Sequence, residues 1–392
     1  MLARSDIAAG IVLVPRPRDP RLDFFRGIGM FIILIAHTPW NSWTDWIPAR
    51  FGFSDAADMF VFCSGMASSL AFARVFLERG WWMGTARIAH RVWQVYWAHI
   101  GSFFVVISVL VAADHYFAVD HYVREELNLQ SFFDEPRLHL LGLMTLTYVP
   151  NYFDILPMYL AILAMIPIVM GLARVRLALV VVFVLGLWLA ANFEMIDLEA
   201  DPWNRRGWFF NPFGWQLVFF TGFALVRGWL PTPPRDRRLV WLCIAIVLLA
   251  APVSCQQGFG CYAGFDTLPV LGRIHEALAF WTDKMNYGPL RYLHFMATAY
   301  LAWMASGVGG ANLTGMLVDM TRRVGQQTLA VFLTGLVMAQ VLGMALDRLG
   351  RDFWTVTLIN IVGCAILVAA AYMVHWFKQG PWKGARGTGG AE

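Results

Sequence analysis

The chain has 392 residues, of which 58% are hydrophobic and only 14% are charged, and its mean hydropathy is +0.56. This composition excludes a soluble globular protein of this length and predicts a polytopic protein of the lipid bilayer, with no nucleic acid as a partner. The net charge of +4 says little by itself, because in a membrane protein the positions of Lys and Arg carry the information. Five scattered cysteines are too few for a zinc site, so no metal is expected.

Ten stretches are apolar and long enough to cross a bilayer as helices. A shorter apolar stretch at 138–149 ends at Pro150-Asn151 and is expected to form a re-entrant or interfacial helix. The predicted fold class is therefore all-α, a polytopic membrane helical bundle of about ten transmembrane helices plus that short helix. The ten stretches are 24–41, 55–77, 91–113, 155–173, 176–193, 213–230, 239–254, 291–308, 329–347 and 353–377.

The distribution of basic residues predicts how this bundle is oriented. With ten spans and an internal N-terminus, the segments placed inside carry more Lys and Arg than the outer loops, as the positive-inside rule requires. A full span at 138–149 would move Arg174 and Arg176 outside, so that solution is the poorer one. We expect three parts: a cytoplasmic arm at 1–20, one membrane domain at 21–377 and a flexible cytoplasmic tail at 378–392.

The first stretch combines the composition of a membrane span with ionisable side chains. Arg26 and His37 are eleven residues apart, close to three helical turns, so both project from one face about 16 Å apart along the axis. Asp23 lies one turn before Arg26 on nearly the same face. Ionisable residues inside a membrane usually face a bundle interior or a water-filled cavity. Taken singly, Arg26 is equally well explained as a positive-inside anchor, and His37 as a residue of the wet interface.

Two carboxylates open the second stretch, which runs antiparallel to the first and enters at the depth of His37. Asp55 and Asp58 are therefore candidates to contact His37 and to act with it in catalysis. A carboxylate beside an imidazole raises its basicity and suits it to deprotonate a hydroxyl. The alternative is that these acids cap the helix. Capping explains Asp55 well, but it explains Asp58 less well, because Asp58 lies one turn further into the helix.

The inner end of the third stretch is basic. Arg87 and Arg91 precede it, and together with Arg26 and the neighbouring Asp23 they would form the mouth for a phosphorylated ligand such as coenzyme A. Positive-inside anchoring explains Arg87 at least as well.

Polar and aromatic side chains at the ends of other stretches are candidates for binding a polar acceptor. An aromatic belt and helix capping are the alternatives for several of them. The candidates are Trp40, Asp154, Tyr159, Asn211, Trp215, Gln216, Arg291 and His294.

Taken together, the motifs of these stretches resemble one known family. The pattern D-x-x-R-G, the ten residues between Arg26 and His37, and the run FVFCSG at 60–65 are similar to signatures of the acyltransferase-3 membrane acyltransferases. Cys63 replaces the usual small aliphatic residue. Six runs in the same order, extending from about residue 20 to 345, resemble the OpgC family, the succinyltransferases of osmoregulated periplasmic glucans. They are RLDFFRG…H, GFSDAADMFVFCSGM, DILPMYLAI, FNPFGWQ, LRYLHF and GQQTLAVF.

The resemblance implies a membrane acyltransferase with ten spans in the bacterial inner membrane and both termini in the cytoplasm. It implies transfer of a succinyl group from cytoplasmic succinyl-CoA to hydroxyls of a periplasmic glucan, with the acyl-CoA as co-substrate and no permanently bound cofactor. The family's key pair maps onto Arg26 and His37. His37 would act as a general base or as a transient acyl carrier, and the sequence does not decide between these.

Two other functions compete with this one. The first is an O-acetyltransferase of another envelope glycan, and the second is a transporter of an acyl carrier or glycan. A transporter more often has internal repeats and broken helices, which are not evident here. A succinyl donor requires a cationic partner, or one with several hydrogen-bond donors, for its free carboxylate, and Arg291 and His294 are candidates. Cys255 and Cys261 are expected to form a disulfide in an outer loop, while the glucan's structure and any homo-oligomer stay open.

Overall fold

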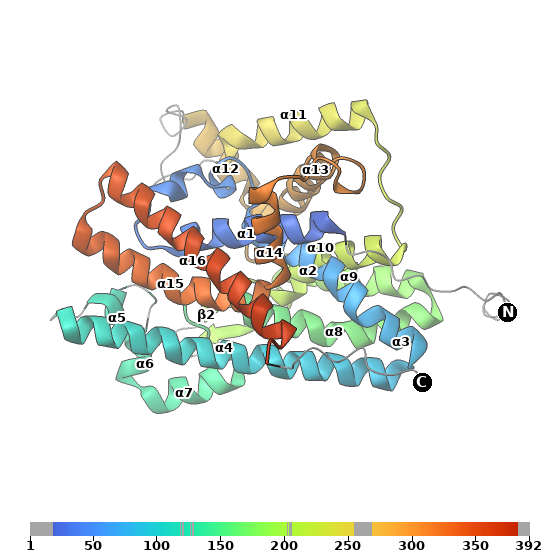
Figure 1. The fold of residues 1–392 in the computed structure, drawn as a ribbon. Helices are drawn as coiled ribbons and strands as arrows, with labels where there is room; N and C mark the ends of the chain where they lie inside the picture. Colours follow the sequence, from blue (N-terminus) through green and yellow to red (C-terminus); the bar gives the residue numbers. More distant parts are fainter. Residues whose placement is uncertain are drawn as a thin grey trace, which may run out of the picture.

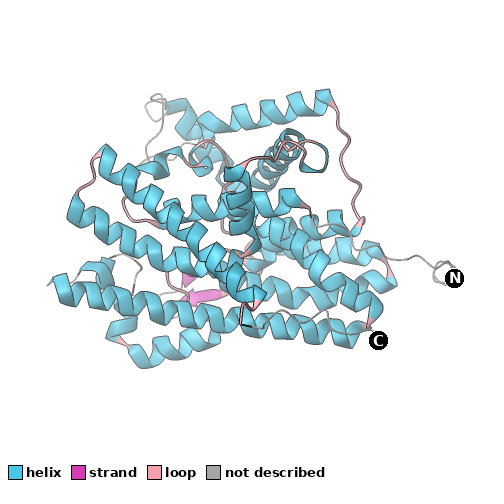
Figure 2. Cartoon of the chain, viewed as in Figure 1, coloured by secondary structure: helices cyan, strands magenta, loops and turns pink. Residues whose placement is uncertain are grey.

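The structure is a computed structural model, which describes residues 19–382 apart from 118, 120, 126, 128, 202, 204, 205 and 255–268. This part of the chain is built almost wholly of helices, as Figure 2 shows. Its two strands, β1 (Glu199–Asp201) and β2 (Arg206–Gly207), pair antiparallel. The predicted helical fold class is confirmed. The expected disulfide between Cys255 and Cys261 lies outside the described residues.

Five helices in the described part of the chain are long and apolar enough to cross a membrane. They mark the chain as a membrane protein, although this criterion does not confirm about ten spans. The five are Ala56–Glu78, Trp81–Phe117 (α4), Ile155–Val175 (α8), Thr328–Leu349 (α15) and Phe353–Gln379 (α16). The first comprises α2 (Ala56–Ser68), a π-helical turn η3 (Ser69–Ala73) and α3 (Arg74–Glu78).

The other five predicted spans are also helices, but they are shorter or more charged. They are α1 (Pro20–His37), α9 (Leu177–Asn192), α10 (Pro212–Arg227), α11 (Arg237–Val253) and α13 (Pro289–Ala305). The last four have 16 or 17 residues each. That length gives about 25 Å of helix, which is less than the roughly 30 Å thickness of a hydrocarbon core. α1 has 18 residues, but it carries Arg21, Asp23 and Arg26.

Shorter elements connect these helices. The stretch predicted to be a non-spanning helix at 138–149 forms α7 (Pro136–Thr145). Its 10 residues extend only about 15 Å, which is too short to cross a bilayer. The remaining elements are η1 (Ser42–Trp46), η2 (Pro48–Arg50), α5 (His121–Glu125), α6 (Gln130–Asp134), α12 (Pro269–Thr282), η5 (Val308–Gly310) and α14 (Met316–Gln326).

α1 lies in the middle of the bundle, where it packs against α2, α14, α15 and α16 (Figure 1). It begins at Pro20, because proline suits the first turn of a helix and because the Asp19 side chain accepts a hydrogen bond from the Arg21 backbone N–H. It ends at His37. The side chains of this helix therefore line the interior of the protein.

The crossing of α1 with α14 requires glycine on both helices. A Cβ atom on Gly27 would lie 2.0 Å from the carbonyl oxygen of Thr321, and one on Gly325 would lie 1.8 Å from that of Asp23. Real side chains do not fit at such distances, so the two backbones are in direct contact. Gly27 immediately follows Arg26, and this contact therefore fixes α1 at the turn that carries the Arg26 side chain.

Candidate functional site

A cavity of about 500 Å³ lies at the end of α1 that carries His37, and we call it the His37 cavity. Its wall comes from α1, the α1–α2 connection, the start of α2 and the segments that precede α8 and α10. Phe332 of α15 also borders it. The acidic and basic side chains of its lining are His37, Asp55, Asp154, Arg206 and Lys284.

His37 is the last residue of α1, and its side chain is half-buried. The imidazole packs at a tilt against Tyr152, with ring centroids 4.8 Å apart and planes at 58°. Tyr152 has a left-handed backbone conformation, with φ 67°, which is uncommon for a residue with a side chain. Asp55 and Lys284 are the charged groups that act electrostatically on the imidazole. The His37 side chain therefore shares with one anion and one cation a cavity that admits a ligand.

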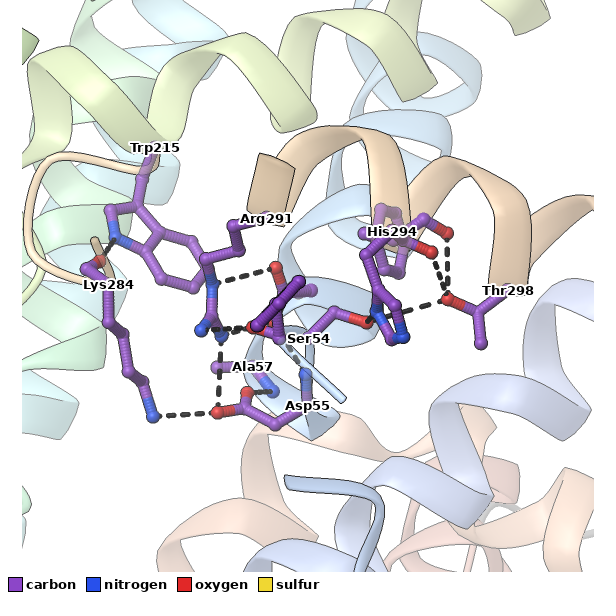
Figure 3. Close-up of polar contacts among 11 residues, drawn as sticks. Ser54, Asp55, Ala57, Trp215, Lys284, Arg291, His294 and Thr298 are labelled. Carbon is purple, nitrogen blue, oxygen red and sulfur yellow. Dashed lines mark hydrogen bonds and ion pairs between the residues drawn. The ribbon is translucent and has the colours of Figure 1, made fainter. Parts of the chain in front are cut away.

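Two cations converge on Asp55 at the wall of this cavity, as Figure 3 shows. Lys284 Nζ lies 2.6 Å from Asp55 Oδ2, and Arg291 Nη2 lies 3.2 Å from the same oxygen. Arg291 binds Asp58 with two nitrogens: Nη2 lies 2.5 Å from Oδ2, and Nε lies 3.1 Å from Oδ1. The four side chains form one network, in which Asp55 connects the cavity wall to the buried Arg291.

Both acids also organise the start of α2. The Asp55 side chain accepts a hydrogen bond from Ala57 N–H, and the Asp58 side chain accepts one from Asp55 N–H, which completes a capping box. The capping interpretation of Asp55 is confirmed, and it extends to Asp58. Asp58 is fully buried and does not line the His37 cavity. No hydrogen bond joins His37 to either acid in the described part of the chain.

Asp154 lies in the His37 cavity, where a residue that binds the acceptor is expected. Asp154 is the residue directly before α8, and it is only 5% exposed. Within the described chain its Oδ1 atom has no hydrogen-bond partner. Burial raises the pKa of Asp154 to about 6. The Asp154 carboxyl group is therefore a polar part of the cavity wall that keeps one oxygen without a partner among the described residues.

Three of the residues predicted to bind the acceptor hold α10 against its neighbours instead. Asn211 is the N-cap of α10, in agreement with the capping alternative. Trp215 Nε1 donates to the backbone oxygen of Lys284 at 2.9 Å, and Gln216 Nε2 donates to a backbone oxygen of α9 at 2.7 Å. None of the three lines the His37 cavity. Their side chains position the cavity wall without facing the space inside it.

Three more predicted acceptor residues also lie outside the His37 cavity. Arg291 is 4% exposed and pairs with the two acids, as described above. His294 Nδ1 is hydrogen-bonded to Ser54 Oγ at 2.8 Å, as Figure 3 shows. Trp40 is 80% exposed at the protein surface beyond the end of α1. In this structure, therefore, neither Arg291 nor His294 borders the space in which His37 lies.

A second, much smaller cavity of about 30 Å³ lies beside Arg26, and we call it the Arg26 cavity. Its lining includes Arg91 and Tyr159, so two of the predicted donor-binding cations meet here, together with a phenol predicted to bind the acceptor. Arg87 is exposed and does not line it, and Asp23 is buried where α1 meets α14. A space of this size admits about one water molecule, and coenzyme A is far larger.

Phe332 lines both cavities. Its ring stacks on that of Phe60 of α2, with centroids 6.3 Å apart and planes at 25°. Because both side chains are also buried in the core, this aromatic pair forms part of the partition between the Arg26 cavity and the His37 cavity. A molecule that extends from one cavity to the other therefore passes beside Phe332.

Several lining residues were not assigned to the site by sequence reasoning, and those that matter most to the argument are Tyr152, Arg206, Lys284 and Phe332. The first three lie in short connections or at a strand, where helical periodicity gives no information about direction. Phe332 lies inside an apolar helix, where a phenylalanine is unremarkable. The available signal for Lys284 is only that it lies shortly before the run LRYLHF, in a segment otherwise poor in basic residues.

Comparisons with known proteins agree with the motifs. No curated protein and no solved structure matches the chain. A sequence model of the family described as OpgC protein matches residues 18–379, nearly the whole chain. The matched region contains α1 with Arg26 and His37 and every residue that lines the two cavities. The chain therefore belongs to the OpgC protein family, in agreement with the resemblance of its six motifs.

Proposed function

We propose that this protein is an O-succinyltransferase of the bacterial inner membrane, which moves a succinyl group from cytoplasmic succinyl-CoA to hydroxyls of a periplasmic glucan. Membership of the OpgC family supports the acyltransferase class, and the long apolar helices support a location in a membrane. One observation carries the proposal. Two cavities follow α1, with Arg26 at one and His37 at the other, and Phe332 borders both.

His37 supplies the chemistry of the transfer. As general base, its imidazole takes the proton of a glucan hydroxyl while the hydroxyl oxygen attacks the carbonyl carbon of the thioester. The carbon–sulfur bond then breaks, and the coenzyme A thiolate takes the proton from the imidazolium. In the alternative path the imidazole attacks the thioester first and releases the thiol of coenzyme A. The glucan hydroxyl then displaces the imidazole from the acyl group, and both paths give the same products.

The other end of α1 holds the donor. Arg26 and Arg91 present two guanidinium groups to one small cavity, and guanidinium groups suit phosphate recognition because they donate two parallel hydrogen bonds. The axial separation of about 16 Å between Arg26 and His37 is comparable with an extended pantetheine arm. For the arm to reach His37, the Arg26 cavity has to widen, and the arm then passes beside Phe332.

The test is acyl transfer by the purified protein in lipid vesicles. Glucan extracted from cells that lack the protein serves as acceptor, succinyl-CoA as donor, and mass spectrometry counts the succinyl groups on the glucan. The wild-type protein is expected to add them, and His37→Ala to add at least a hundredfold fewer, because general acid–base catalysis contributes about 10²–10⁴-fold.

The matched control is His375→Ala. His375 lies near the end of α16 and its imidazole is hydrogen-bonded to Gln379, far along the chain from α1. This variant should transfer succinyl groups as well as the wild type. Near-normal transfer by a well-expressed His37→Ala variant would exclude the assigned role of His37. Acetyl transfer in place of succinyl transfer by the wild type would point to the acetyltransferase alternative.

A further inference from the structure

The His37 cavity contains two cationic side chains, and they differ in how their hydrogen-bond donors are used. Arg206 is anchored to the protein by both terminal nitrogens, since Nη2 binds the backbone oxygen of Val149 and Nη1 lies 3.4 Å from Asn151 Oδ1, and only its buried Nε has no hydrogen-bond partner among the described residues. Among the described residues Lys284 pairs with one carboxylate, that of Asp55, and its side chain remains 35% exposed. An ammonium group has three donors, so Lys284 retains donors that can bind a ligand.

The backbone of Lys284 is held firmly. Its carbonyl oxygen accepts the hydrogen bond from Trp215 Nε1. The preceding Asp283 side chain accepts hydrogen bonds from the backbone N–H groups of Met285 and Asn286, at 3.1 and 2.7 Å. The turn that carries Lys284 is therefore fixed from both sides, and its side chain begins at a defined place in the cavity wall.

The ammonium group is also held in place. It lies 5.3 Å from the centre of the Phe209 ring and 5.6 Å from that of Phe210, within the range of cation–π attraction. Both rings line the His37 cavity as well. Lys284 thus presents a cation in a partly apolar enclosure, where attraction to an anion is stronger than in water.

The negative charge of Asp55 is shared between two cations, Lys284 and Arg291, so it does not neutralise Lys284 fully. The Arg291 guanidinium lies 3.2 Å from the Asp55 oxygen that also contacts Lys284, and it is itself paired with Asp58. The two acids and the two cations balance in charge, and Asp55 keeps a cationic partner when Lys284 turns toward a ligand. A second carboxylate can therefore bind Lys284 without leaving Asp55 buried and unpaired.

We propose that Lys284 binds the free carboxylate of the acyl group and so selects a dicarboxylic donor over a neutral one. This inference rests on the proposed acyl transfer and adds to it the residue that recognises the acyl group. Lys284 lines the same cavity as His37 and acts on its imidazole electrostatically. The two terminal carbons of an extended succinyl group are roughly 4 Å apart, so a thioester at His37 places the carboxylate well inside this cavity.

The experiment compares two donors that differ in the carboxylate. Succinyl-CoA and butyryl-CoA have acyl chains of four carbons, and only the first carries a free carboxylate. Each is offered to the vesicle-reconstituted protein with the same extracted glucan, and the ratio of succinyl to butyryl transfer is measured. The wild type should prefer succinyl. Lys284→Met should lower the ratio by about 10- to 100-fold, since a hydrogen bond to a charged group contributes about 1.5–3 kcal/mol.

Three further variants separate recognition from structural damage. Lys284→Arg should keep most of the preference for succinyl, because it retains the charge. Arg206→Gln should leave the ratio unchanged even if both rates fall. In the double variant Asp55→Asn with Lys284→Met no unpaired Asp55 remains, and the ratio should be as low as in Lys284→Met alone.

The outcomes distinguish this inference from the proposed function. A wild type that transfers neither acyl group refutes both. A wild type that prefers succinyl, together with a Lys284→Met variant of unchanged ratio, refutes only the role of Lys284. The same holds if Arg206→Gln changes the ratio and Lys284→Met does not. Loss of butyryl transfer in both Lys284→Met and the double variant would also overturn the inference, because the side chain would then be needed whatever the donor.

Discussion

Among single residues, Arg291 and Asp58 form a deeply buried ion pair, with side-chain exposures of 5% and 0%. Removing two charges from water is costly, and the attraction between them offsets that cost only when the geometry is good and the other polar atoms are satisfied. Here the contact is bidentate, and the third Arg291 nitrogen, Nη1, donates to the Phe53 carbonyl oxygen. The pair therefore fixes α13 to the start of α2, next to the His37 cavity.

Breaking this pair from one side should destabilise the protein strongly. Arg291→Met leaves Asp58 buried without its cation, which costs about 3–5 kcal/mol in comparable cases. The expected result is a clear fall in the thermal midpoint of the detergent-solubilised protein. Asp58→Asn combined with Arg291→Met removes both charges and should recover much of the loss.

The control is an exposed pair of similar chemistry. Arg322 and Asp319 lie 3.2 Å apart on α14, with side-chain exposures of 33% and 65%. Arg322→Met should change stability by less than about 1 kcal/mol. A double variant as unstable as Arg291→Met alone would show that the charge left on Asp58 is not the cause.

At the scale of elements, the crossing of α1 and α14 predicts unequal effects for two equivalent substitutions. Gly325→Ala adds a Cβ that would lie 1.8 Å from the Asp23 carbonyl oxygen, so the helices must move apart. Gly335→Ala on α15 adds a Cβ whose nearest neighbour, Cδ2 of Leu367, is at 3.6 Å, an ordinary contact. The first should lower the thermal midpoint and weaken coenzyme A binding. The second should be neutral or stabilising by up to about 1 kcal/mol, because alanine favours helix. Equal midpoints for the two variants would exclude the close crossing.

The long helices could be predicted from the sequence because a long, continuous apolar segment can form few structures other than a membrane-spanning helix. The stretches at 155–173 and 353–377 correspond to Ile155–Val175 and Phe353–Gln379. α14 was not predicted because it is amphipathic and short, and a polar segment between two spans resembles a loop. α4 extends well beyond its predicted stretch, from Trp81 to Phe117, because its basic first turns resemble an interface.

The site could be predicted only where one helix determines it. The spacing of Arg26 and His37 follows from the geometry of α1 alone. The ion pair of Asp58 with Arg291 could not be predicted in this way, since the two residues are 233 positions apart and nothing in a single sequence connects them. Lys284 was missed for the same reason: its position against Asp55 depends on a turn held by Trp215 on another helix.

For the whole molecule, the arrangement of the two cavities bears on the sides of the membrane from which donor and acceptor approach. Arg26 and Arg91 line one cavity, His37 and Lys284 line the other, and Phe332 borders both. If the Arg26 end of α1 faces the cytoplasm, as the distribution of basic residues predicts, the donor and the acceptor approach from opposite sides of the membrane. The acyl group then travels along α1 inside the protein, and the bulk of coenzyme A never has to cross the bilayer.

This arrangement can be tested with sealed vesicles in which the orientation of the protein is known. Glucan is confined to the face at the His37 end of α1, and succinyl-CoA is supplied only at the opposite face. Succinyl groups should appear on the glucan. Arg26→Ala should reduce their number, chiefly by weakening donor binding. Arg26→Lys should restore only part of the donor binding, because a point charge holds phosphate less well than a guanidinium. Vesicles with the donor enclosed beside the glucan should give little product, since the donor then reaches only the His37 end. Product formed only when donor and glucan share a compartment would rule out transfer through the membrane, while leaving the acyltransferase activity itself intact.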